Sequence, residues 1–189
     1  MPTPVTVVTA ATDAGPAGLV VGSFVSVSLR PPLVGIFIDE KSASWPPMSA
    51  AGSFTVNVLA EDQRELCARF ARSGGGAGKF AGLSWWESAH GNPVLPGTTA
   101  WLDCLVRQVQ QLGDHFFAVA EVVGLGVDAG RPPLVFHRGA LSTVSAAGAD
   151  APDPGAVQPP PGPHPAAGRT GPGRPAPSTT TPSDRRDQA

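Results

Sequence analysis

Hydroxyl and apolar side chains alternate between residues 22 and 34, which is the clearest pattern in the chain. A period of two is typical of a strand with one buried face and one face on a polar environment. Pro31 and Pro32 interrupt the ladder because neither carries a backbone N–H. The apolar run 33–38 follows and predicts a second strand. The stretch therefore indicates a sheet edge with its serines on the solvent side.

The rest of the chain shows more strand patterns than helix patterns. We expect further strands at residues 5–10, 17–22, 53–59, 100–112, 115–127 and 134–137, with a tight turn at Gly113-Asp114 joining the two longest. A short helix is expected after Ser44, a potential N-cap followed by prolines, and a second helix at residues 62–72. Many strands with few short helices predict an antiparallel barrel with inserted helices.

Composition changes sharply near residue 145. The segment 146–189 holds half of the chain's 22 prolines, no aromatic residue, and Val157 as its one large aliphatic side chain. Such a segment buries too little apolar area to offset the entropy cost of ordering. We therefore expect a folded domain at residues 1–145 and a disordered tail at residues 146–189.

Charge and targeting signals are weak. The formal net charge is −2, which gives no reason to expect nucleic acid or an anionic membrane as a partner. No apolar run approaches the roughly 20 residues of a membrane span, and residues 1–4 lack the features of a signal peptide. The two cysteines, Cys67 and Cys104, have no metal-type spacing. These features predict a reduced, cytoplasmic protein.

Familiar catalytic motifs are absent from the sequence. There is no Gly-x-Ser-x-Gly, no dinucleotide-binding Gly-x-Gly-x-x-Gly between a strand and a helix, and no metal-ligand spacing among the four histidines. The glycine-rich run before Lys79 is not a phosphate loop, because Ser73 stands where glycine is needed and Phe80 where Ser or Thr is needed. We therefore expect no metal site and no Rossmann fold.

Eight blocks in order resemble the flavin reductase family, which supplies reduced flavin to partner monooxygenases. They are residues 5–9, 23–33, 44–46, 52–60, 69–70, 79–82, 113–115 and 136–139. The resemblance implies a split antiparallel β-barrel of Greek-key type that forms a homodimer, with flavin bound near the subunit interface. It also implies FMN or FAD as flavin, NADH or NADPH as hydride donor, and a flavin-dependent monooxygenase as partner.

The same resemblance assigns roles to individual residues. Contacts to the flavin ring are implied for Gly18, Leu19, Val20, Gly22, Ser23, Phe37, Ile38 and Asp39. Contacts near its phosphate are implied for Ala43, Ser44, Arg69 and Phe70. His115 is implied as the catalytic residue, with Arg138 and Gly139 also on the nicotinamide side. From the residues alone, Arg69 could instead be a solvated helix residue, and His115 a packed hairpin histidine.

Two departures keep other functions open. Leu141 stands where the family usually has a tyrosine, and the chain starts almost directly at the first strand, without the family's preceding helix. A non-catalytic flavin-binding module and a split-barrel oxidase of another substrate are therefore alternatives. Measuring NADH oxidation with added free flavin would distinguish a flavin reductase from these two alternatives.

Overall fold

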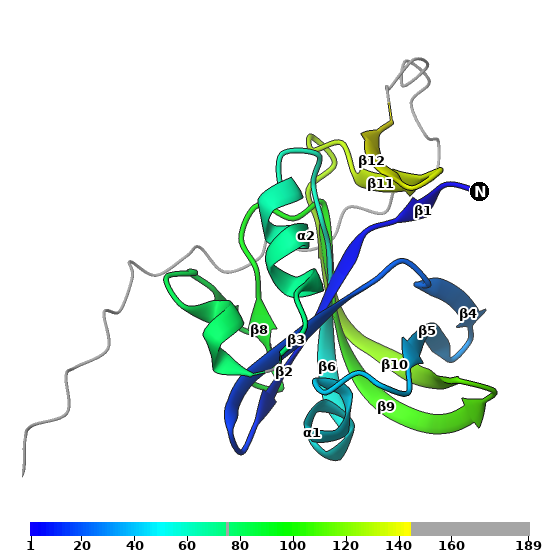
Figure 1. Cartoon of the computed structure of the whole chain (residues 1–189). Helices are drawn as coiled ribbons and strands as arrows, with labels where there is room; N and C mark the ends of the chain where they lie inside the picture. Colours follow the sequence, from blue (N-terminus) through cyan, green and yellow to red (C-terminus); the bar gives the residue numbers. More distant parts are fainter. Residues whose placement is uncertain (75, 145–189) are drawn as a thin grey trace, which may run out of the picture. The chain divides into compact units, whose positions relative to one another are not determined.

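A seven-stranded antiparallel sheet forms the centre of the computed structural model, which describes residues 1–74 and 76–144 (Figure 1). Its strand order is β3-β2-β6-β9-β10-β5-β4. The strands are β2 (Thr6–Thr12), β3 (Gly15–Val21), β4 (Val25–Leu29), β5 (Pro32–Asp39), β6 (Ser53–Val58), β9 (Ala100–Leu112) and β10 (His115–Val127). The expected mainly antiparallel β fold with short helices is confirmed. The predicted tail lies outside the described residues.

Smaller elements surround this sheet. One small sheet joins β1 (Thr3–Pro4), β11 (Leu134–His137) and β12 (Ala140–Thr143), and another joins β7 (Trp86–Glu87) and β8 (Pro93–Val94). The helices are α1 (Trp45–Ala50), α2 (Arg64–Ala71) and the 3₁₀ turn η1 (Ala77–Phe80). Sequence patterns predicted β11, α1 and α2 but missed β1, β7, β8 and β12, which are too short to show a period.

The β9–β10 hairpin has the predicted bounds. Gly113 adopts a φ of 63° in the two-residue turn, a conformation that glycine reaches without steric cost. The alternating residues Cys104, Ala118 and Ala120 face the barrel interior, as their spacing predicted. The hairpin starts β10 at His115, directly opposite Asp39 at the end of β5.

Two apolar cores lie on opposite faces of β2. Val8 and Ala10 point into the barrel interior, where Phe54 and Met48 pack against them. Val7, on the other face, packs with residues of α2 and η1. Both faces of β2 are therefore buried, and α2 is held against the outside of the sheet.

The serine-rich stretch forms a strand at the edge of the sheet, as predicted, but the prediction that one face is buried is wrong. β4 is exposed along most of its length, with Val27 45% and Leu29 85% exposed. Its one neighbour in the sheet is β5, because β4 is an edge strand. The two prolines mark a hairpin: the Arg30–Pro31 bond is cis, and Pro32 begins β5 opposite Leu29. The Ser-Val alternation therefore belongs to an edge strand that the other described residues leave largely exposed.

Both cysteines are free and buried. Burial, with a smaller contribution from the negative charge of Asp103, raises the pKa of Cys104 to about 12. Burial also raises the pKa of Cys67, which lies on α2. Within the described residues, the structure has no helix long and apolar enough to cross a membrane.

Candidate functional site

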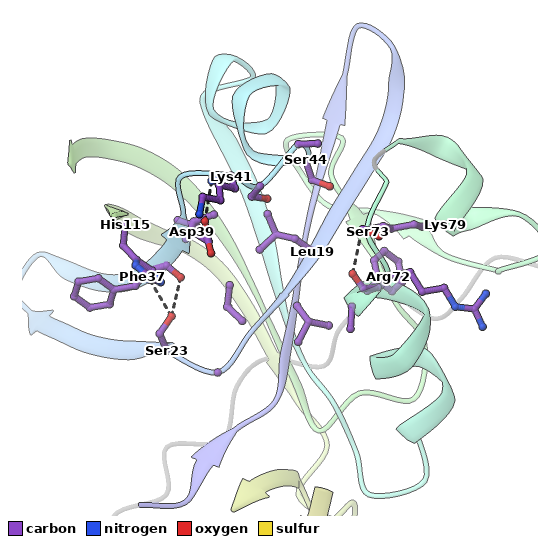
Figure 2. A pocket seen from close by; sticks show the side chains of 18 of the residues that line it. Leu19, Ser23, Phe37, Asp39, Lys41, Ser44, Arg72, Ser73, Lys79 and His115 are labelled. Carbon is purple, nitrogen blue, oxygen red and sulfur yellow. Dashed lines mark hydrogen bonds between the residues drawn. The ribbon is translucent and has the colours of Figure 1, made fainter. Parts of the chain in front are cut away.

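A pocket of about 830 Å³ opens where the ends of β3 and β5 meet the start of α1 and the end of α2 (Figure 2). This volume falls within the roughly 300–1,000 Å³ typical of small-molecule sites. Leu19, Val20 and Ile38 provide an apolar wall. Figure 2 shows Leu19 in the middle, with His115 and Phe37 at one end and Lys79 and Arg72 at the other. The pocket therefore has two chemically different ends.

The loop between β3 and β4 is fixed by the hydroxyl of Ser23. Its Oγ donates to the Phe37 carbonyl at 2.9 Å and accepts from the Phe37 N–H at 3.0 Å. Val25, the first residue of β4, pairs with Gly35 of β5. The two Ser23–Phe37 bonds extend this pairing by two residues, before the start of β4. Ser23 thus positions the rim of the pocket. Its hydroxyl hydrogen is already used within the protein.

The His115 end combines an imidazole with an exposed aromatic ring. The Nδ1 atom of His115 lies 2.8 Å from Asp114 Oδ1, and this hydrogen bond with the charge of His115 lowers the pKa of Asp114. With Nδ1 engaged, Nε2 is the ring atom left for a ligand. Phe37 stacks on Phe117 with centroids 4.5 Å apart. This end suits a planar ligand with polar edges.

The opposite end is cationic. The Lys79 Nζ donates to the carbonyl oxygens of Phe70 at 3.0 Å and Gly18 at 3.3 Å, and partial burial lowers the pKa of Lys79. An ammonium group has three protons, so one remains for an anion in the pocket. Arg72 also lines the pocket at this end, whereas Lys41 lies beside Asp39 on the side of His115 (Figure 2). Asp39 is the one carboxylate among the described lining residues. The charge balance favours a ligand with a phosphate group.

Ser44 lies beside this end with a buried side chain. Ser44 occupies the N-cap position of α1, as predicted, but it has helical dihedral angles and makes no side-chain cap hydrogen bond. The prolines in the first turn of α1 remove N–H groups that a cap would satisfy. The Ser44 hydroxyl has no partner among the hydrogen bonds of the described residues, and the residue lines the pocket.

Most of the predicted site residues line this pocket. They are Leu19, Val20, Gly22, Ser23, Phe37, Ile38, Asp39, Ala43, Ser44, Phe70 and His115. Gly18 lies just outside the lining and reaches it through the bond from its carbonyl oxygen to Lys79. The predicted residues therefore converge from four separate stretches of the sequence.

Three predicted residues lie elsewhere. The Arg69 Nη1 donates to the Ala81 carbonyl at 2.9 Å, and Arg69 lines two neighbouring pockets instead. Arg138 and Gly139 form the β11–β12 turn, where Arg138 has a φ of 52°. This hairpin is joined to the pocket through Thr3, a lining residue that pairs with Phe136.

Sequence reasoning missed the cationic lining. Lys41, Arg72 and Lys79 were not predicted as site residues, although Lys79 belongs to one of the eight resembling blocks. The glycine-rich run before Lys79 lacks the spacing of a phosphate loop and follows a helix. Its proximity to the pocket follows from the packing of η1 against β3, which local spacing does not encode.

Comparison with known proteins identifies the class. The flavin reductase-like domain family matches residues 1–145, and the chain belongs to this family. A flavin reductase of Pseudomonas putida is 44% identical over 139 residues, covering 73% of this chain and 81% of the relative. The HsaB reductase subunit of a flavin-dependent monooxygenase from Rhodococcus jostii is 42% identical, covering 72% and 69%.

Solved structures agree with this assignment. The NADH:FAD oxidoreductase SgcE6 of Streptomyces globisporus superposes with a TM-score of 0.73 at 31% identity, covering 77% of this chain and 87% of that one. The prediction of a flavin reductase is therefore confirmed. Within residues 1–74 and 76–144, the structure has no cluster of three or more His, Cys, Asp or Glu side chains suited to a metal ion.

Proposed function

We propose that the pocket between β3, β5 and α2 is where this flavin reductase binds FMN or FAD together with NADH or NADPH, and that the reduced flavin passes to a partner monooxygenase. The observation that carries the proposal is the polarity of the pocket. An apolar wall separates a histidine end from a cationic end, which matches a ligand with a flat heterocycle and a phosphate. The chemistry of the lining residues therefore fits a flavin nucleotide.

The chain's own residues bind and orient the ligands. Lys79, held by two carbonyl oxygens, offers its remaining proton to the flavin phosphate, and the Ser44 hydroxyl is the second donor nearby. Leu19 and Val20 exclude water from one face of the ring. When bound, the flavin and the nicotinamide supply the hydride-transfer chemistry, and the protein contributes proximity and orientation.

His115 is proposed to act on the nicotinamide side. Asp114 fixes the ring through Nδ1, so that Nε2 can hydrogen-bond a substrate. His115→Asn keeps a donor near the position of Nδ1 but removes Nε2. We expect kcat/KM for NADH to fall about tenfold, the scale of one lost hydrogen bond, with flavin affinity nearly unchanged. Steady-state NADH oxidation with added FMN or FAD measures this.

His90→Asn is the matched control. The Nδ1 atom of His90 also bonds an aspartate, lying 2.7 Å from Asp103 Oδ2, but His90 lines none of the pockets near α2. This variant should keep wild-type kcat/KM. If His115→Asn behaved like His90→Asn, His115 would be a packed hairpin histidine. If the wild-type protein bound flavin but oxidised no NADH or NADPH, it would be a non-catalytic binding module.

We also infer a homodimer formed through the β4 apolar surface, defined as Val25, Val27 and Leu29 with the neighbouring rings of Phe37 and Phe117. Val27 and Phe117 meet over Gly35, where a Cβ atom would lie 3.1 Å from Val27 Cγ2 and 2.6 Å from Phe117 Cε2. The surface is therefore continuous across β4, β5 and β10. It reaches the pocket at Phe37, so a second copy would stand beside the histidine end.

A further inference from the structure

One polar lining residue of the flavin pocket comes from outside the central sheet. Thr3 lies on β1, which forms the small sheet with β11 and β12, and it lines the pocket beside Gly22. The strand register pairs Thr3 with Phe136 of β11. The β11–β12 hairpin therefore fixes the position of Thr3, although Arg138 and Gly139 at its turn do not line the pocket.

Gly22 keeps the hydroxyl of Thr3 open to the pocket. A Cβ atom at Gly22 would lie 3.2 Å from Thr3 Oγ1, which is closer than an ordinary van der Waals contact. Because glycine has no such atom, the space beside the partly buried Thr3 stays free. The Thr3 hydroxyl makes no hydrogen bond to another described residue, so its proton and its lone pairs are available to a ligand.

Two other polar side chains on this rim are already engaged with the backbone. Ser23 uses its hydroxyl both to donate to and to accept from the backbone of Phe37. The Oδ1 atom of Asp39 accepts from the N–H of Lys41 at 2.8 Å, and an ionised carboxylate can only accept. Thr3 adds a neutral hydroxyl that both donates and accepts. Such a group suits an amide edge, where a carbonyl stands beside an N–H.

We propose that the Thr3 hydroxyl hydrogen-bonds the amide edge of the ring bound beside Gly22, and thereby orients that ring in the pocket. The proposal rests on the proposed function of this pocket. Both ligands carry such an edge, the flavin as the imide of its ring and the nicotinamide as its carboxamide. The shared chemistry is a carbonyl beside an N–H, and binding measurements distinguish the two sources.

Thr3→Val tests this, because it removes the hydroxyl and keeps a β-branched side chain that suits a strand. We expect a loss of about three- to tenfold, the scale of one neutral hydrogen bond. If the partner is the flavin imide, the affinities of FMN, FAD and riboflavin fall alike, because the three share the ring. If it is the carboxamide, flavin affinities stay within about twofold and kcat/KM for NADH falls instead. Flavin fluorescence titrations and steady-state NADH oxidation measure these values.

Thr3→Ser and Thr143→Val are the matched controls. Thr3→Ser retains the hydroxyl and should stay within about twofold of the wild type in every value. Thr143 lies on β12 of the same small sheet but lines neither this pocket nor the two that Arg69 lines, so Thr143→Val should change nothing. Wild-type values in Thr3→Val, an equal loss in Thr3→Ser, or the same loss in Thr143→Val would overturn the proposal. A wild type that bound no flavin would overturn the proposed function itself.

Discussion

Strands β2 and β4 are built from the same kinds of residue, yet their surroundings in the fold are opposite. Both combine valine with hydroxyl side chains, in the order Thr-Val-Val-Thr-Ala-Ala-Thr in β2 and Val-Ser-Val-Ser-Leu in β4. β2 lies between β3 and β6 and is buried on both faces, whereas β4 is an edge strand exposed along most of its length. Similar residue types are therefore buried or exposed according to the number of neighbouring elements that pack on the strand.

The hydroxyl groups of the two strands differ in the same way. The Thr6 Oγ1 donates to the Val21 carbonyl at 2.9 Å, and the Thr9 Oγ1 bonds the Pro93 carbonyl and accepts from Asn57 Nδ2 at 3.0 Å. Among the described residues, the Ser28 Oγ in β4 accepts one hydrogen bond, from the N–H of Arg30 in its own turn. In β2 the hydroxyls are therefore part of the core, because a buried polar group needs a partner.

The largest expected effect comes from placing the same charge in each strand. Val8→Asp buries an unpaired carboxylate in the barrel interior and should cost more than about 4 kcal/mol, a large part of the stability of a typical domain. Val27→Asp places the carboxylate on an exposed side chain and should change the free energy of unfolding of the monomer by less than about 0.5 kcal/mol. Circular dichroism during urea unfolding measures both.

Val8→Ala keeps the comparison informative if Val8→Asp does not fold. It removes two methyl groups without adding charge and should cost roughly 2 kcal/mol. A folded Val8→Asp with a cooperative transition near that of the wild type would contradict the burial of β2.

The second prediction concerns association. Val27→Asp should weaken the proposed dimer about 100-fold, because an unpaired carboxylate would be desolvated at the centre of the β4 apolar surface. Light scattering over a concentration series measures the shift from a dimer towards the 19.2 kDa monomer. Asp13, in the turn between β2 and β3, offers a control: Asp13→Asn should leave association unchanged. Identical dimerisation of Val27→Asp and wild type would place the interface elsewhere.

The smallest effects are expected at two glycines that approach phenylalanine rings. A Cβ atom at Gly18 would lie 2.6 Å from Cε1 of Phe70, a fully buried ring that lines the pocket. Gly18→Ala should therefore cost roughly 1–3 kcal/mol by overpacking. Gly35→Ala meets Phe117 at the same 2.6 Å, but this ring is partly exposed beside the edge strand and can move.

Gly35→Ala should accordingly cost under about 1 kcal/mol, less than Gly18→Ala. Urea unfolding of the two variants side by side measures the difference. Equal costs would show that the edge of the sheet is packed as tightly as the region beneath α2. Weaker flavin binding in Gly18→Ala alone would be a further sign that the Phe70 ring shapes the pocket.

Sequence reasoning predicted the parts of the fold that local patterns control. The bounds of β9 and β10 follow from two period-two runs joined by Gly113-Asp114, and the inward faces of both strands follow from the same period. It predicted the edge position of β4 but not its exposure, because the pattern of an edge strand does not say whether anything covers it. It missed β1 and β12 because strands of a few residues depend on their partners.

The candidate site was also predicted in part: the residues at strand ends were predicted, and the cations near α2 and η1 were missed. Residues at strand ends, such as Leu19 and Ile38, were predicted because resembling blocks place them in order along the chain. Lys79 and Arg72 were missed, since their position depends on how α2 and η1 fold back over β3. Arg69 and Lys79 are ten residues apart, and the packing of the chain between them decides which pocket each cation lines.

The burial of the two thiols has a consequence for the durability of the protein. Reduced flavin that meets oxygen before it reaches a partner yields hydrogen peroxide, which attacks thiolates and not thiols. Cys104, with its pKa raised to about 12, is almost entirely protonated at neutral pH, and the pKa of Cys67 is also raised. Because the chain has only these two cysteines, the enzyme exposes little reactive sulfur to the by-product of its own chemistry.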